Sequence, residues 1–139
     1  MNQADLRSLA QERILDADAL INGGRWSFAY YVAGYAVECA LKSCLLARMI
    51  YTGWVFQEKA KIDECLTHNF ERLINLSGLS DELNAQLAAI PDFVGNWGIT
   101  IRWKVTDRYG RNTEAEARAL YAAITDDPDG VLTWMTSYW

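Results

Sequence analysis

The sequence is poor in the residues that build metal sites. Its 139 residues include one histidine, His68, and three cysteines, Cys39, Cys44 and Cys65, and no two cysteines form a CxxC pair. A structural zinc site needs four such ligands with short spacings, so we expect no metal. The odd number of cysteines also argues against a disulfide framework. It favours reduced, mostly buried thiols in a cytoplasmic protein.

Motifs for cofactors and for membranes are missing as well. The pair Gly23-Gly24 lacks the Walker pattern and no GxGxxG is present, so we expect no nucleotide cofactor held by such a loop, and no other cofactor. The segment MNQADLRSLAQE has no apolar stretch typical of a signal peptide. The apolar run 28–37 is interrupted by Glu38 and Lys42, whereas a membrane span needs about 20 apolar residues. We therefore expect no membrane segment.

Helix-breaking residues are scarce, with two prolines and nine glycines, while apolar residues make up 51% of the chain. This composition is globular, and the length suffices for one hydrophobic core. We expect a single domain over residues 1–139.

The apolar residues repeat with helical spacing. A first helix is predicted to end at Gly23-Gly24, because glycine accepts the left-handed cap conformation. One face of this helix is apolar and consists of Leu6, Ala10, Ile14, Ala17 and Ile21. The segment from about Trp26 to about Met49 is apolar nearly all round, which is typical of a central helix packed against the first.

Shorter helices are predicted in the second half of the chain. Their signals are a stop at Gly78 after 70–76, an N-cap at Ser80 with a stop at Pro91, a capping box of Thr113 and Glu116, and a start at Asp127-Pro128. Residues 54–68 are expected to be a loop, with or without a short helical piece, and 92–112 an irregular connection. The predicted fold is all-α, an antiparallel helical bundle of about five helices.

Charge is distributed unevenly. The net charge is −5, which disfavours nucleic-acid binding except where a stretch of the chain is locally basic. Residues 102–111 form such a basic island, in which Asp107 is the one acid and the cations are interleaved with Trp103 and Tyr109. Either this is a solvated loop anchored by its aromatic residues, or it binds single-stranded RNA or a nucleotide. The candidate ligand-binding residues are Arg102, Lys104, Arg108 and Tyr109.

Two further polar features lie outside the island. Glu38 and Lys42 stand one turn apart on the apolar helix, either as a structural ion pair or as a polar spot that shapes a cleft. His68 precedes a short helix, where it is either a hydrogen-bonded structural residue or a catalytic group that needs a partner nearby in space. His68 is the one catalytic candidate.

The segment RWSFAYYVAGYAVECALK resembles the second helix of HEPN domains, small helical bundles named for nucleotide binding in higher eukaryotes and prokaryotes. The similarity lies in the aromatic and alanine run after a glycine turn and in the spacing Gly-Tyr-x-x-Glu-x-x-x-Lys, formed by Gly34, Tyr35, Glu38 and Lys42. The segments Thr67-His68-Asn69-Phe70 and Arg108-Tyr109 ahead of an alanine-rich helix also resemble members of this group.

The resemblance implies an antiparallel bundle that dimerises and acts around RNA. Many HEPN relatives are metal-independent ribonucleases, often toxins paired with a nucleotidyltransferase partner. Their pattern Arg-x4–6-His is absent, because the nearest arginine before His68 is Arg48, and Arg102 is followed at the right distance by Arg108 rather than histidine. Arginine stays protonated, so it can hold a phosphate and cannot act as a general base.

The functional hypothesis is therefore a HEPN-like module that binds a nucleotide or RNA phosphate, as a homodimer or in a toxin–antitoxin-like pair, with enzymatic activity left open. Two alternatives remain. One is an atypical metal-independent ribonuclease that uses His68, and the other is a purely structural protein-interaction subunit.

Overall fold

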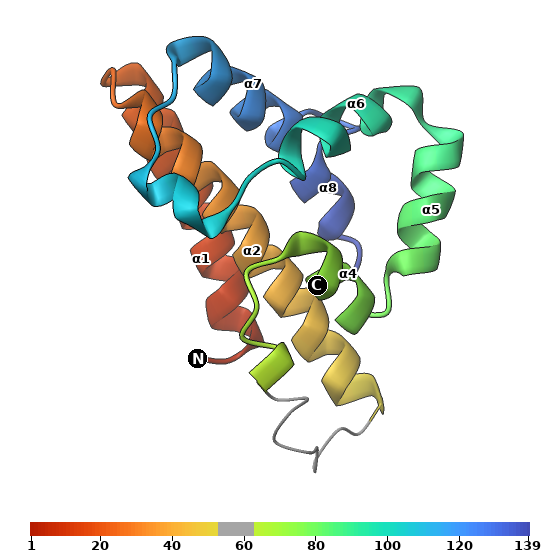
Figure 1. Ribbon diagram of the computed structural model, residues 1–139. Helices are drawn as coiled ribbons and strands as arrows, with labels where there is room; N and C mark the ends of the chain where they lie inside the picture. The colour runs from red at the N-terminus through yellow and green to blue at the C-terminus, as the bar shows by residue number, and fades with distance from the viewer. Residues whose placement is uncertain (53–62) are drawn as a thin grey trace.

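A computed structural model of the chain describes residues 1–52 and 63–139. Within these ranges the regular secondary structure consists of seven α-helices and a 3₁₀ helix, with residues 63–64 also helical and with no strand (Figure 1). The all-α prediction is confirmed, with seven helices where about five were expected. No helix of the described residues is both long and apolar enough to cross a membrane.

The centre of the fold is a pair of long helices, α1 (Gln3–Asn22) and α2 (Trp26–Thr52), which run antiparallel along each other (Figure 1). Between them the chain turns at Gly24, whose φ of 72° is the left-handed conformation that glycine tolerates. The predicted face of α1 is buried at four of its five positions, and Ile14 is partly buried. Both long helices therefore form as the sequence predicts.

The remaining elements are α4 (Phe70–Leu76), α5 (Ser80–Ala89), α6 (Pro91–Thr100), the 3₁₀ helix η1 (Val105–Tyr109), α7 (Glu114–Thr125) and α8 (Val131–Met135). They pack around α2 directly or, for α5 and α6, through their neighbours. Helix α2 contacts α1, α4, η1, α7 and α8, which makes it the central helix. Its buried residues join those of the other helices in one main core, among them Val37, Leu41, Phe93, Leu120 and Ile124.

The irregular connection predicted for 92–112 is wrong over its first half, which is helix α6. Pro91 ends α5 and also occupies the first position of α6, where the missing N–H costs nothing. Phe93 and Trp97, one turn apart, are buried and pack into the core. This packing outweighs the low helix propensity of the two glycines in α6.

Two predicted helix starts are also wrong. Ser80 is the first residue of α5 and the N-cap position is Leu79, which makes no side-chain cap. Asp127-Pro128 lies in a turn, and α8 begins only at Val131. The residue before it, Gly130, packs against the backbone of Asp126. Of the loop predicted at 54–68, residues 54–62 lie outside the described part of the chain.

Candidate functional site

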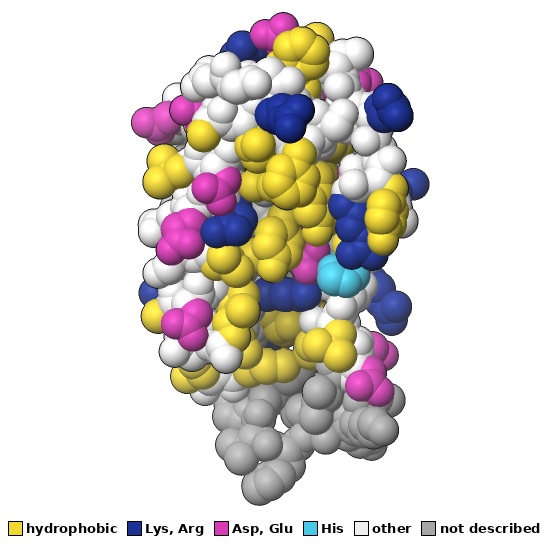
Figure 2. All heavy atoms as spheres, turned by 90° about the vertical axis from the view of Figure 1, so that its left-hand side faces the viewer, with side chains coloured by type: hydrophobic (Ala, Val, Ile, Leu, Met, Phe, Trp, Pro, Cys, Tyr) yellow, Lys and Arg dark blue, Asp and Glu magenta, His cyan; other side chains and the backbone are white. Residues whose placement is uncertain are grey.

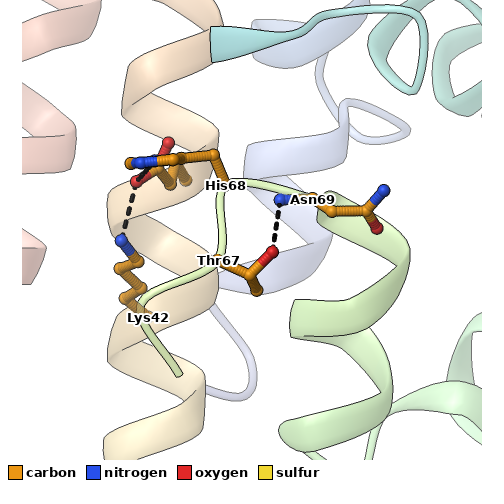
Figure 3. A network of polar contacts seen from close by, with 5 residues as sticks. Lys42, Thr67, His68 and Asn69 are labelled. Atoms are coloured by element: carbon orange, nitrogen blue, oxygen red, sulfur yellow. Dashed lines mark hydrogen bonds and ion pairs between the residues drawn. The ribbon is translucent and has the colours of Figure 1, made fainter. Parts of the chain in front are cut away.

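Glu38 is a buried carboxylate on the central helix, with 2% of its surface exposed. Its Oε1 receives a hydrogen bond from Nζ of Lys42 at 2.7 Å, one turn further along α2. The same oxygen lies 2.8 Å from Nδ1 of His68, thirty residues away in sequence (Figure 3). The structure therefore brings the sole histidine to the Glu38–Lys42 pair.

His68 is held by the loop that leads into α4. Asn69 caps this helix, because its Oδ1 accepts a hydrogen bond from the N–H of Arg72 at 2.9 Å. The N–H of Asn69 in turn donates to Oγ1 of Thr67 at 3.1 Å (Figure 3). Phe70, the next residue, is buried and stacks on Trp103 with ring centroids 5.1 Å apart. The loop is thus fixed on both sides of His68.

The contact with Glu38 determines what the imidazole can do. When the N–H group of Nδ1 donates a hydrogen bond to the carboxylate, Nε2 of a neutral imidazole can accept a proton. In a protonated imidazole, Nε2 carries an N–H group and is a hydrogen-bond donor. Half of the His68 side chain is exposed, at 49%. Within the described part of the chain, Nε2 forms no hydrogen bond. His68 is therefore oriented by a buried carboxylate and has one ring nitrogen left for a ligand.

The other oxygen of Glu38, Oε2, is left without a partner by the described residues. Oε2 is buried and accepts no hydrogen bond from any described residue. Lys42 and His68 both approach Oε1, so a single carboxylate oxygen carries both contacts. Breaking either contact would leave a buried charge less compensated, which is costly in the interior.

A pocket of about 390 Å³ opens beside His68. One wall is the segment that carries His68 and the other is the segment that follows α6. The lining residues are His68, Asn69, Phe70, Glu71, Ile101, Trp103, Lys104, Val105 and Thr106. Of the predicted basic island, Lys104 is the cation that lines this pocket, and we call it the His68–Lys104 pocket.

Trp103 anchors the island to the core. It is 3% exposed, its Nε1 donates to the carbonyl of Tyr31 at 3.2 Å, and its ring stacks on Tyr31 and Phe70. Lys104 follows directly, and its N–H donates to Oδ2 of Asp107 at the start of η1. For Trp103 the anchoring interpretation is therefore confirmed.

The other candidates of the island lie elsewhere on the surface. Arg102 is exposed. The pKa of Tyr30 is raised, mainly by burial and then by the charges of Asp107 and Glu116, and the charge of Arg102 opposes this rise. The guanidinium of Arg108 lies 4.8 Å from the ring centre of Tyr109, which is 78% exposed. None of Arg102, Arg108 and Tyr109 lines the His68–Lys104 pocket.

Sequence reasoning missed the contact of His68 with Glu38, because no pattern along the chain links residues so far apart. Comparison with known proteins adds no assignment: no family model, no curated protein and no solved structure matches the chain significantly. Among the described residues, no group of three or more histidine, cysteine, aspartate or glutamate side chains is arranged to hold a metal ion.

Proposed function

We propose that this chain is a HEPN-like module that binds the phosphate of a nucleotide or of RNA in the His68–Lys104 pocket. The observation that carries this proposal is the orientation of His68 by the buried Glu38 at a pocket that Lys104 also lines. A protonated imidazole and an ammonium group both donate charge-assisted hydrogen bonds, and phosphate oxygens accept them.

The surroundings favour a nucleotide over a simple anion. Ile101 and Val105 line the pocket, are partly exposed and give it an apolar wall, on which a base or ribose can pack. The proposal includes a homodimer, a nucleotidyltransferase-type partner and a cytoplasmic location, as the HEPN resemblance and the cysteine content imply. Arg102, Arg108 and Tyr109 then contact longer RNA outside the pocket, while Glu38, held by Lys42, shapes the pocket through its contact with His68.

Binding of a short fluorescein-labelled oligouridine and of UMP at low salt tests the pocket. Lys104→Ala should weaken both about tenfold, because one charge-assisted hydrogen bond is lost. Arg118→Ala is the matched control: it removes the same charge from α7, where Arg118 pairs with Glu114 at 2.8 Å. We expect the control to bind like the wild type. Equal losses in both variants would mean unspecific attraction and would contradict the proposal.

A second candidate function is metal-independent RNA cleavage, which the Glu38–His68 contact favours. Nε2 of His68 would take the proton of a ribose 2′-hydroxyl as that oxygen attacks the adjacent phosphorus. The 5′-oxygen would leave and take a proton from solvent, which yields a 2′,3′-cyclic phosphate and a 5′-hydroxyl. Arginine at the family's usual position is absent, so Lys104 is the cation available to the phosphate.

Cleavage of oligouridine in the presence of a chelator tests this second function. His68→Ala should abolish formation of the cyclic phosphate, and Glu38→Gln should reduce it by up to about four orders of magnitude, as losing the carboxylate that orients a catalytic histidine does. Cleavage that persists unchanged in His68→Ala would exclude His68 as the base.

A further inference from the structure

An aromatic stripe runs along the outer side of α2. Phe28, Tyr31 and Tyr35 follow one another at steps of three and four residues, and the same steps lead on to Glu38 and Lys42. The ring centroids of Phe28 and Tyr31 are 6.0 Å apart and those of Tyr31 and Tyr35 are 6.2 Å apart, with interplanar angles of 25° and 8°. The aromatic stripe, Phe28–Tyr31–Tyr35, is thus a row of nearly parallel rings.

The stripe is covered only in part by the described residues. Phe28 is 55% exposed, and Tyr31 and Tyr35 are half-buried. Figure 2 shows apolar side chains as a band down this face, with basic side chains on both sides and the histidine near the lower end of the band. A contiguous exposed apolar band of this kind is typical of a binding surface.

The end of the stripe away from His68 opens into a groove of about 420 Å³ between α1 and α2. We call it the Phe28 groove; its lining residues are Arg13, Asp16, Ala19, Leu20, Arg25, Phe28 and Val32. A neighbouring pocket of about 460 Å³ shares Leu20, Arg25 and Phe28 with it and extends to Asn112. Phe28 therefore presents its ring at the junction of two hollows.

Cations lie along the stripe at both ends. Arg25 lines the Phe28 groove and forms no ion pair with any described residue. Arg13 lines the same groove, but its charge is paired with Asp16 at 3.1 Å and with Glu12 at 3.4 Å. At the other end, where the stripe meets His68, Lys42 is paired with Glu38, and Lys104 of the His68–Lys104 pocket forms no ion pair with any described residue.

We propose that the aromatic stripe is a base-stacking track for single-stranded RNA, which leads from the His68–Lys104 pocket to the Phe28 groove. This inference rests on the proposed function and names its ligand more closely, as a strand of several nucleotides. Bases stack on aromatic rings regardless of their identity, and flanking cations meet the phosphates. On a chain of net charge −5, such a face is the local exception that an RNA ligand needs.

The charge pattern distinguishes this occupant from a second copy of the chain. Each end of the track carries a cation that pairs with no acid among the described residues, Arg25 at the Phe28 groove and Lys104 at the pocket. Two copies facing each other through the stripe would bring cation against cation whether the two helices ran parallel or antiparallel. Such like-charge contacts oppose association, whereas a polyanion finds a complementary charge at both ends of the track.

The test compares oligouridine with UMP for variants of two exposed aromatic residues on α2. Phe28→Ala should weaken oligouridine binding by about five- to a hundredfold, as loss of one stacked base does, and should leave UMP binding in the His68–Lys104 pocket unchanged. Phe28→Leu should lose nearly as much, because it keeps apolar bulk without a ring face, while Phe28→Trp should bind like the wild type. Tyr51→Ala is the control, since it removes a ring that is 88% exposed near the far end of α2.

The outcomes separate the track from the proposed function. If Phe28→Ala leaves oligouridine binding intact while Lys104→Ala weakens it, the track is wrong and the pocket stands. If the wild type binds neither oligouridine nor UMP, both proposals fail. If sedimentation shows that Phe28→Ala lowers the oligomeric mass without changing the RNA affinity, the stripe covers a second copy of the chain and the track is wrong.

Discussion

Gly34 of α2 leaves the space that the indole of Trp103 occupies. A Cβ at position 34 would overlap Cδ1 and Nε1 of that indole. Trp103 directly precedes Lys104 in the sequence. Its ring stacks on Phe70, which directly follows His68-Asn69 at the start of α4. The glycine on α2 thus allows the two segments that form the His68–Lys104 pocket to come together.

Gly34→Ala should therefore destabilise the protein and disrupt the pocket. Forcing extra volume into a packed site costs about 1–3 kcal/mol, and urea unfolding measures that loss. Gly95→Ala is a matched control in α6, because a Cβ there meets nothing within 4 Å. A helical alanine should raise the stability of the control by about 0.5–1 kcal/mol. Equal effects at the two positions would show that Trp103 does not depend on Gly34.

The contact between Glu38 and His68 should be energetically coupled. A double-mutant cycle with Glu38→Gln and His68→Asn should give a coupling of about 0.5–1 kcal/mol, a modest value because half of His68 is exposed. The exposed pair Glu114 and Arg118 on α7 is the reference, with an expected coupling of about 0.3–0.5 kcal/mol. No coupling between Glu38 and His68 would mean that the carboxylate does not hold the imidazole.

The two buried thiols should make stability fall at alkaline pH. Burial raises the pKa of Cys39 to about 11 and that of Cys44 to about 12, from an ordinary 9.0. As pH rises above 9.0 the unfolded chain loses these protons first, so unfolding is favoured until the folded thiols ionise as well. Urea midpoints measured across this range should fall less steeply in Cys39→Ala plus Cys44→Ala than in the wild type. Identical slopes would contradict the burial of these thiols.

The capping box of α7 should contribute stability that is lost in acid. The N–H and hydroxyl of Thr113 lower the pKa of Glu116 below its ordinary 4.5. Because the folded pKa is the lower one, the contribution is complete above the ordinary value and disappears as pH falls through the folded value. Glu116→Gln should therefore show a smaller loss of thermal stability between neutral and acidic pH than the wild type. A variant that parallels the wild type would exclude this linkage.

Features that depend on neighbours in sequence could be predicted. The face of α1 follows from apolar spacing, and the box of Thr113 and Glu116 forms between residues three apart. The ion pair of Glu38 and Lys42 likewise needs one helical turn. These interactions are fixed by helix geometry alone, so the sequence pattern suffices to find them.

Features that depend on tertiary packing could not be predicted. Helix α6 contains Gly95 and Gly98, and it is stabilised by burial of Phe93 and Trp97 in a core that other helices supply. The contact of His68 with Glu38 joins elements thirty residues apart. Exposure of Phe28 depends on which side of α2 the other helices leave open, since α2 reads as apolar nearly all round.

The central claim is that RNA phosphate binds beside His68, and the sole histidine permits a direct measurement. Protein labelled with ¹⁵N only in histidine gives the imidazole signals of one residue. Titration with oligouridine, with saturation followed by fluorescence anisotropy under the same conditions, should shift the Nε2 resonance in step with binding. In Lys104→Ala the shift should require about tenfold more RNA. Imidazole resonances that stay unmoved at saturation would show that RNA binds elsewhere and would contradict the account.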